Sequence, residues 1–246
     1  DTVWDPFFAA GANPDNKNGT EEIITSSVSK AWPVPAAGIG ALTYLLEIIT
    51  GIIGSRQRWR TMPWLVLLFG FMIVPLGAIS ITFIIIQPII LDTWCTLCLI
   101  AAAAMLLQIP YSFDEIVATI GFLRRRAKAG QPWLLILFTG DTDEPSEADK
   151  KPQPETDNFS QSPLTIFRES VLGGVSLPWQ LAVSALIGIW LMCTRLTLGS
   201  SGDMANADHL IGALVLTMTV TASAEVMRPI RLLNLLLGMA LFITPF

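Results

Sequence analysis

Two cysteines separated by two residues, Cys95 and Cys98 in WCTLC, carry the clearest chemical potential of the sequence. On a helix their side chains lie on one face, because residues three apart are neighbours there. Cys95 falls in the first turn of an expected helix, where free backbone N–H groups and the helix dipole favour a thiolate. The spacing therefore predicts a redox-active pair that closes as a disulfide. Cysteine also serves as an ordinary small apolar residue in membranes, so that alternative stays open.

The third cysteine, Cys193, stands near the end of a later apolar segment, at about the predicted depth of Cys98. It is either an inert packed residue or, if the two halves of the chain pack together, a partner thiol for the CxxC pair. No metal site is predicted from the three cysteines and the one histidine.

The elements that position these cysteines are expected to lie in a membrane. Mean hydropathy is +0.57, and only 14% of the 246 residues are charged, where a soluble domain carries about a quarter. The apolar residues come in long blocks rather than amphipathic stripes, which is typical of membrane spans. The net charge of −5 leaves no basic footprint for nucleic acid, and no nucleic-acid partner is expected.

We predict an all-α, polytopic helical membrane protein with about six transmembrane helices in two three-helix halves. The expected spans are 35–54, 62–90, 94–113, 179–198, 209–227 and 230–246. A short helix around 21–29 is expected before the first span, and the apolar run at 133–138 is too short to span and suits the interface.

Basic residues orient these spans. If the first span runs from outside to inside, the segments 55–61, 114–178 and 228–231 lie inside and hold 12 of the 15 basic residues. This asymmetry follows the positive-inside rule, and it places the CxxC pair at the outer end of the third span.

Two polar positions fall within or beside the spans. Glu47 lies inside the first span, where an acid is either functional, extended to the inner interface or paired with an arginine. His209 opens the fifth span and is interpreted as an interfacial residue, with Asp208 before it as the helix N-cap.

From about residue 20 to 128 the sequence resembles bacterial members of the vitamin K epoxide reductase family. The resemblance rests on TSSVSKAWPVPAAGIGALTYLLE and DTWCTLCLI, in which Gly40 and Tyr44 match the Gly-x-x-x-Tyr of the family. From about 174 to 246 the chain resembles the SPW-repeat family, through SLPW, ADHLIGAL, AEVMRP and the closing TPF. The expected domains are an outer (periplasmic) segment, a reductase-like membrane domain, a cytoplasmic linker and an SPW-repeat-like membrane domain, at 1–34, 35–128, 129–173 and 174–246.

The resemblance implies a quinone bound in a helical bundle beside the CxxC pair. Cys98 would be the quinone-facing thiol, Cys95 the thiol that exchanges with outer thiols, and Tyr44 a hydrogen-bond donor to a quinone carbonyl. The implied setting is a bacterial inner (plasma) membrane with the CxxC pair facing the periplasm. The implied partners are the lipid bilayer and a thioredoxin-like thiol protein or other membrane subunits.

The sequence departs from the family pattern in the outer segment. It has no cysteine there, since Thr25 or Ser26 stands at the position of the family's shuttle thiol. Ala36 replaces an asparagine that usually binds the quinone, and the family helix before the outer loop has no counterpart in the sequence. Two functions therefore stay open, a thiol–quinone oxidoreductase and a non-catalytic subunit of a larger membrane complex.

Overall fold

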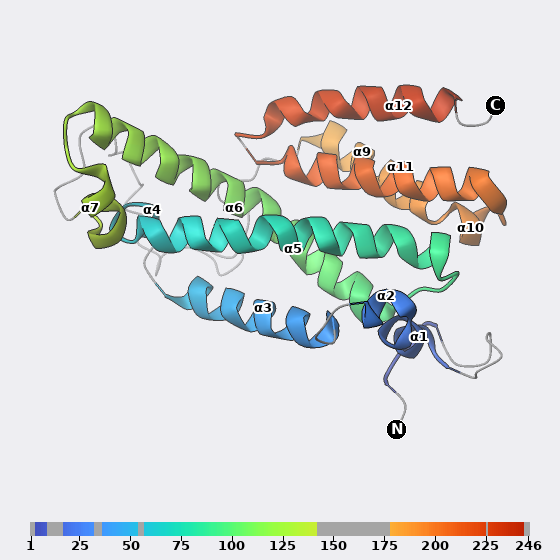
Figure 1. The fold of residues 1–246 in the computed structure, drawn as a ribbon. Coiled ribbons are helices and arrows are strands. Elements are labelled where there is room, and N and C mark those ends of the chain that lie inside the picture. Colours follow the sequence, from blue (N-terminus) through green and yellow to red (C-terminus); the bar gives the residue numbers. More distant parts are fainter. Residues whose placement is uncertain are drawn as a thin grey trace, which may run out of the picture.

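A computed structural model of the chain is an elongated bundle of helices (Figure 1). The structure describes residues 3–8, 17–31, 36–53, 57–141, 178–224 and 226–243. Its helices are α1 (Gly19–Thr25), α2 (Ser27–Lys30), α3 (Ala36–Ile52), α4 (Arg58–Thr61), α5 (Pro63–Ile90), α6 (Thr96–Lys128), α7 (Trp133–Thr139), α9 (Trp179–Met192), α10 (Thr194–Thr197), α11 (Gly202–Thr221), η1 (Arg228–Leu232) and α12 (Leu233–Ile243). No strand occurs within these ranges, and the all-α prediction is confirmed.

Two of the described helices, α5 and α6, are long and apolar enough to cross a membrane. Their most apolar windows have mean hydropathies of 2.4 and 1.7, and most residues in those windows are not buried inside the protein. Helices α3 and α9 are apolar but shorter. The membrane character expected from the sequence is therefore present, while the six-span topology stays a prediction.

The predicted boundaries agree with the structure for α3 and α5 and differ for later helices. Helix α9 ends at Met192 and is followed by the separate short helix α10, where one span over 179–198 was expected. Helix α6 continues to Lys128, beyond the predicted end near 113, because its polar second half can remain helical outside an apolar layer. Helix α11 begins at Gly202 and not at 209. Asp208 therefore lies inside the helix, and its predicted role as N-cap is wrong; Ser201 holds that position.

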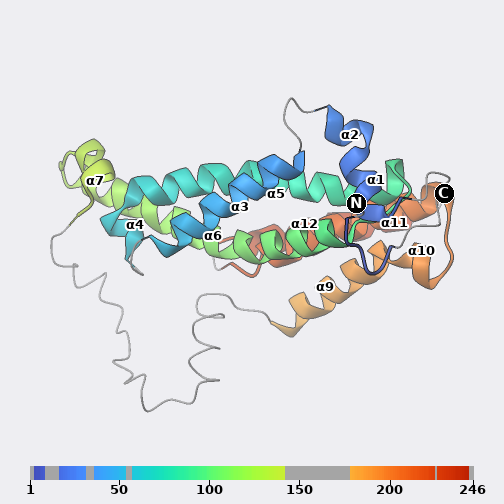
Figure 2. The same ribbon diagram turned by 90° about the horizontal axis from the view of Figure 1, so that it is seen from below.

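The short helices gather at the two ends of the bundle. Helices α4 and α7 lie at one end, and α1, α2 and α10 lie at the other (Figures 1 and 2). The long helices α5 and α6 connect these ends, so the start of α6 lies at the end that carries α1 and α2. The CxxC pair at the start of α6 thus lies at the end of the bundle that carries the N-terminal helices.

His209 joins the C-terminal helices to the N-terminal ones. Pro88 has no backbone N–H, so the carbonyl of Ile84 one turn earlier lacks its helical donor. His209 Nε2 lies 3.0 Å from that carbonyl oxygen and, when protonated, donates to it. The histidine is 1% exposed, and its ring meets Trp94 edge to face with centroids 5.0 Å apart. The sequence did not predict this buried contact, because the hydrogen-bond partner of His209 comes from a distant helix; the interfacial position of His209 stays a prediction.

Helices α9 and α11 cross closely at two glycines. A Cβ atom on Gly212 would lie 2.7 Å from the carbonyl oxygen of Gly188 and 2.8 Å from Cβ of Leu191. Only hydrogen fits at this crossing, as in other close helix contacts in membranes.

Gly212→Ala is expected to destabilise the protein by about 1–3 kcal/mol, because the added methyl group forces the two helices apart. Gly238→Ala in α12 is the matched control, since nothing lies within 4 Å of its added Cβ. Thermal unfolding in detergent, followed by circular dichroism, compares the two midpoints. Equal midpoints would show that the crossing tolerates a methyl group.

Candidate functional site

Cys95 and Cys98 form a disulfide at the start of α6, with their Cα atoms 5.2 Å apart. Cys95 is the N-cap of the helix, and its sulfur accepts a hydrogen bond from the backbone N–H of Cys98 at 3.1 Å. The structure thus brings the predicted pair together where unpaired N–H groups favour a thiolate on Cys95 once the disulfide is reduced.

Gln87, near the end of α5, holds the peptide that precedes the helix. Its side chain is fully buried, and its Oε1 accepts the backbone N–H of Cys95 at 3.2 Å. Its backbone carbonyl also accepts the N–H groups of Leu91 and Thr93 in the connecting turn. The sequence analysis did not single out Gln87, although a lone amide in a long apolar helix is a signal for such a role.

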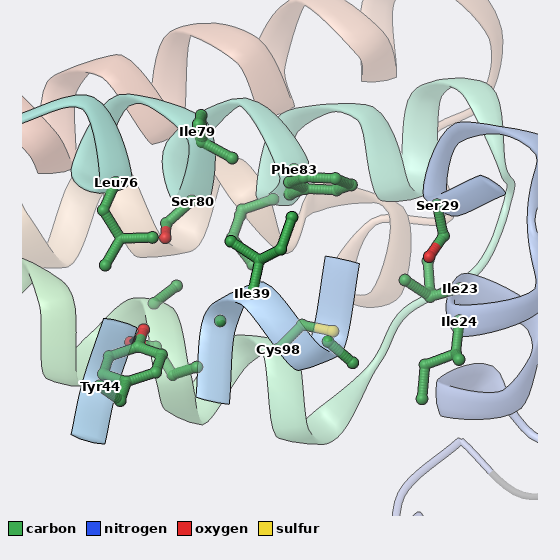
Figure 3. A pocket seen from close by; sticks show the side chains of 15 residues that line it. Ile23, Ile24, Ser29, Ile39, Tyr44, Leu76, Ile79, Ser80, Phe83 and Cys98 are labelled. Carbon is green, nitrogen blue, oxygen red and sulfur yellow. Dashed lines mark hydrogen bonds between the residues drawn. The ribbon is translucent and has the colours of Figure 1, made fainter. Parts of the chain in front are cut away.

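Cys98 lines an apolar cavity of about 220 Å³ between α3, α5, α6 and the N-terminal helices (Figure 3). Tyr44 lies at one end of this cavity, and Ile23 and Ser29 lie at the other, with Cys98 between them. The tyrosine hydroxyl donates to the carbonyl oxygen of Ala101 at 3.0 Å. Its oxygen keeps a lone pair for a donor, and turning the hydroxyl toward a ligand would break the bond to Ala101.

The second sulfur of the pair faces a different environment. Cys95 is completely buried, and Thr20 Oγ1 lies 3.5 Å from its Sγ. The described N-terminal residues 3–8 and 17–31, here called the outer cap, cover it. Asp5 fastens this cap, because its carboxylate accepts the Thr20 hydroxyl at 2.7 Å together with the hydroxyl and backbone N–H of Thr96. Cys95 is therefore closed to thiols in solution in this structure.

Residues 8–113 match the model of the Vitamin K epoxide reductase family. This reductase-like segment contains the CxxC pair, Tyr44, most of the outer cap and every residue that lines the cavity beside Cys98. No curated protein and no solved structure matches the chain. The family match supports the resemblance stated for the N-terminal part, and the SPW-repeat resemblance remains a prediction.

Cys193 does not reach the CxxC pair. It is a free, half-buried thiol that lines a second apolar cavity of about 420 Å³ between α5, α6, α9 and α11. Cys98 is not among the residues of that second cavity. The hypothesis of a partner thiol is therefore not supported by any contact in the structure.

Glu47 is buried in the reductase-like segment rather than extended toward an interface. Its side chain is 4% exposed, and neither carboxylate oxygen has a hydrogen-bond partner. The expected ion pair with an arginine is not observed for Glu47. Arg58 instead pairs with Glu115 of α6, which was not predicted. Within the described residues, no group of His, Cys, Asp and Glu is arranged to hold a metal ion.

Hydrogen bonds keep Asp5 ionised in the outer cap. Burial alone would raise the pKa of Asp5. Hydrogen bonds from the Thr96 and Thr20 hydroxyls and from backbone N–H groups have the larger, opposite effect, so the pKa falls well below its ordinary value of 3.8. A depressed folded-state pKa stabilises the cap above the ordinary value, and this stabilisation is lost as the pH falls toward the folded-state pKa.

Asp5→Ala is therefore expected to speed reduction of the Cys95–Cys98 disulfide by about 10-fold at pH 7, equivalent to about 1.4 kcal/mol of cap opening. A phosphine reductant, which also acts in acid, allows the rate ratio of variant to wild type to be measured against pH. The ratio is expected to stay constant between pH 7 and pH 5 and to fall toward one below about pH 4. A ratio near one at neutral pH would contradict the fastening role of Asp5.

Proposed function

We propose that the protein is a membrane thiol–quinone oxidoreductase that exchanges electrons between outer thiols and a membrane quinone through Cys95 and Cys98. One observation carries this proposal. The two sulfurs of the disulfide face different environments, since Cys98 lines an apolar cavity and Cys95 lies under the outer cap. A pair that transfers electrons between a membrane ligand and a soluble thiol needs these two faces.

The cavity beside Cys98 suits the ring of a quinone. Its walls are almost entirely apolar, and the hydroxyls of Tyr44 and Ser80 supply polar groups for ring oxygens. The volume of about 220 Å³ is below the roughly 300–1,000 Å³ of drug-sized sites, so we expect it to hold a ring and leave an apolar tail in lipid.

The proposed reaction balances as a two-electron exchange. The dithiol form of Cys95 and Cys98 loses two electrons and two protons as the S–S bond forms. The quinone gains two electrons and two protons and leaves as the quinol. An outer dithiol then reduces the disulfide by attack on Cys95, and the outer cap must open for this step because Cys95 is fully buried. A thioredoxin-like thiol protein is the partner that this exchange would use.

We also propose the six-span topology in a bacterial plasma membrane, with the CxxC pair outside and an SPW-repeat-like domain at 174–246. Two supports are the run of basic residues at 124–128, at the opposite end of α6 from Cys98, and the apolar character of α3, α5 and α9. Introduced cysteines test this orientation in intact cells. Lys30→Cys is expected to react with a membrane-impermeant maleimide, and Lys128→Cys is expected to react only after lysis.

The enzymatic proposal is tested by turnover. Purified protein in lipid nanodiscs is expected to reduce a short-chain quinone with dithiothreitol as the electron source, at a rate well above the reaction without protein. Thiol-dependent turnover that stays at the uncatalysed rate would reject the proposal.

A non-catalytic subunit of a larger membrane complex is the second candidate function. It is favoured by the complete burial of Cys95 and by the lack of any cysteine in residues 1–34 that could relay electrons to it. Helix α12, which has no buried residue, offers a surface for such an assembly. Copurification of stoichiometric membrane subunits, together with absent turnover, would favour this candidate.

A further inference from the structure

A buried acid lies one helical turn from the tyrosine of the cavity. Glu47 and Tyr44 are three residues apart on α3, so their side chains share one face of the helix. Glu47 is 4% exposed, and both of its carboxylate oxygens are buried without a hydrogen-bond partner. An ionised carboxylate is costly in such surroundings unless a cation or several donors accompany it.

Gln108 of α6 is the polar side chain next to Glu47. Its Oε1 is likewise buried and has no donor. The amide of Gln108 also has N–H donors, but neither carboxylate oxygen of Glu47 has a hydrogen-bond partner, so these donors do not bond to it. A proton on Glu47 would let the acid donate to Gln108 Oε1, the buried acceptor that lacks a donor.

Polar groups continue from this pair in both directions along α3. Toward the cavity, Tyr44 lines the same cavity as Cys98. Toward the opposite end, the carbonyl oxygen of Thr50 accepts from Arg58 Nη1 at 3.1 Å, and Arg58 pairs with Glu115. By the rise of 1.5 Å per residue, Gln108 lies roughly 15 Å along α6 from Cys98. The acid therefore stands between the cavity and the end of the bundle that carries α4.

We propose that Glu47 holds a proton against Gln108 and relays it through Tyr44 to the ligand in the cavity beside Cys98. This inference rests on the proposed function. When the S–S bond forms, the two thiols release two electrons and two protons. Both electrons and the proton of Cys98 go to the quinone, and the proton of Cys95 leaves to outer water. The second proton of the quinol comes from Glu47, which regains one from water at the Arg58 end.

Glu47→Gln keeps the size and hydrogen bonding of the side chain but cannot carry a proton. It is expected to slow dithiol-dependent quinone reduction by about 100-fold, the lower range for loss of general acid–base catalysis. Glu47→Asp should recover part of the rate, because it restores a carboxyl group. Thr82→Val in α5 is the matched control, since that exposed hydroxyl donates to the carbonyl of Ala78 in its own helix, and it should leave the rate unchanged. Non-reducing peptide mapping should show the Cys95–Cys98 disulfide in all three variants.

Infrared spectroscopy tests the proton directly and does not depend on turnover. The wild-type protein is expected to show the C=O stretch of a protonated, buried carboxyl group, which is absent in Glu47→Gln and shifted in Gln108→Leu. If the spectrum of Glu47→Gln shows no lost carboxyl band, the proton site is rejected.

The outcomes separate this inference from the proposed function. An inactive wild-type protein rejects the proposed function and the relay together, while the infrared band still decides the proton site. An active wild-type protein with an equally active Glu47→Gln variant rejects the relay alone. Slow turnover in Glu47→Gln with recovery in Glu47→Asp and an unchanged Thr82→Val supports it.

Discussion

Cys98→Ala is expected to abolish dithiol-dependent quinone reduction, with a loss of at least about 1,000-fold. Cys98 is the sulfur of the disulfide that lines the cavity between α3, α5 and α6, and removing it leaves no thiol to react with a ligand there. Cys95 alone cannot substitute, because it is buried on the other side of the pair under Thr20. Steady-state turnover in nanodiscs, followed by the loss of quinone absorbance, measures the effect.

Cys193→Ala is the matched control for that loss. Its thiol lines the second cavity and is not paired with another cysteine. The variant should therefore keep the wild-type rate. A large loss in Cys193→Ala, or near-normal turnover in Cys98→Ala, would mean that the reaction takes place at a site other than the cavity beside Cys98.

Thr20→Cys is expected to divert the disulfide. Thr20 Oγ1 lies 3.5 Å from Cys95 Sγ, so a sulfur in its place is close enough to form an S–S bond after a small rotation of the side chain. After reduction and re-oxidation, most of the protein should carry a link between positions 20 and 95, with Cys98 left free for alkylation. Non-reducing peptide mapping and mass spectrometry quantify both products.

Thr25→Cys provides the comparison for this exchange. Thr25 is exposed and its hydroxyl donates to the carbonyl of Glu21, although the family resemblance places the missing shuttle thiol at Thr25 or Ser26. The structure predicts little or no link from position 25 to Cys95. If Thr25→Cys forms the link and Thr20→Cys does not, the arrangement of the outer cap over Cys95 is wrong.

Local sequence patterns were sufficient to predict the CxxC pair and the helices that carry it. The long apolar blocks of α3 and α5 have the length and composition of spans, and the boundaries agree because apolar blocks end at polar residues. The two cysteines share a helix start, so their pairing depends only on contacts within a few residues. These features depend only on residues that are close together in the sequence.

The residues that complete the site could not be predicted in this way, because their partners are distant in the sequence. Asp5 accepts hydrogen bonds from Thr96, 91 residues later. His209 meets the carbonyl of Ile84, which is free because Pro88 follows it by four residues. An acid or a histidine has the same local pattern whether it faces water or such a partner, so only the packing of the helices separates the two.

Burial also changed the interpretation of Glu47. From the sequence, an acid in the inner half of a span could extend to the interface or pair with an arginine. In the structure Arg58 forms an ion pair with Glu115, and Glu47 lies beside Gln108. The lone amides Gln87 and Gln108 in otherwise apolar helical stretches are the signals that sequence reasoning passed over. Gln87 is buried and accepts the backbone N–H of Cys95, and the Oε1 atom of Gln108 is buried.

The central claim is that a quinone binds against Cys98, and Cys95→Ala allows one direct measurement of it. This variant leaves two free thiols, Cys98 in the first cavity and Cys193 in the second. The rates at which both thiols react with a membrane-permeant maleimide are measured by mass spectrometry, with and without a saturating short-chain quinone. The quinone is expected to slow alkylation of Cys98 by at least about 10-fold, as for a site more than 90% occupied, and to leave Cys193 unchanged. If the quinone protects neither thiol, or protects Cys193 alone, the result would contradict the account.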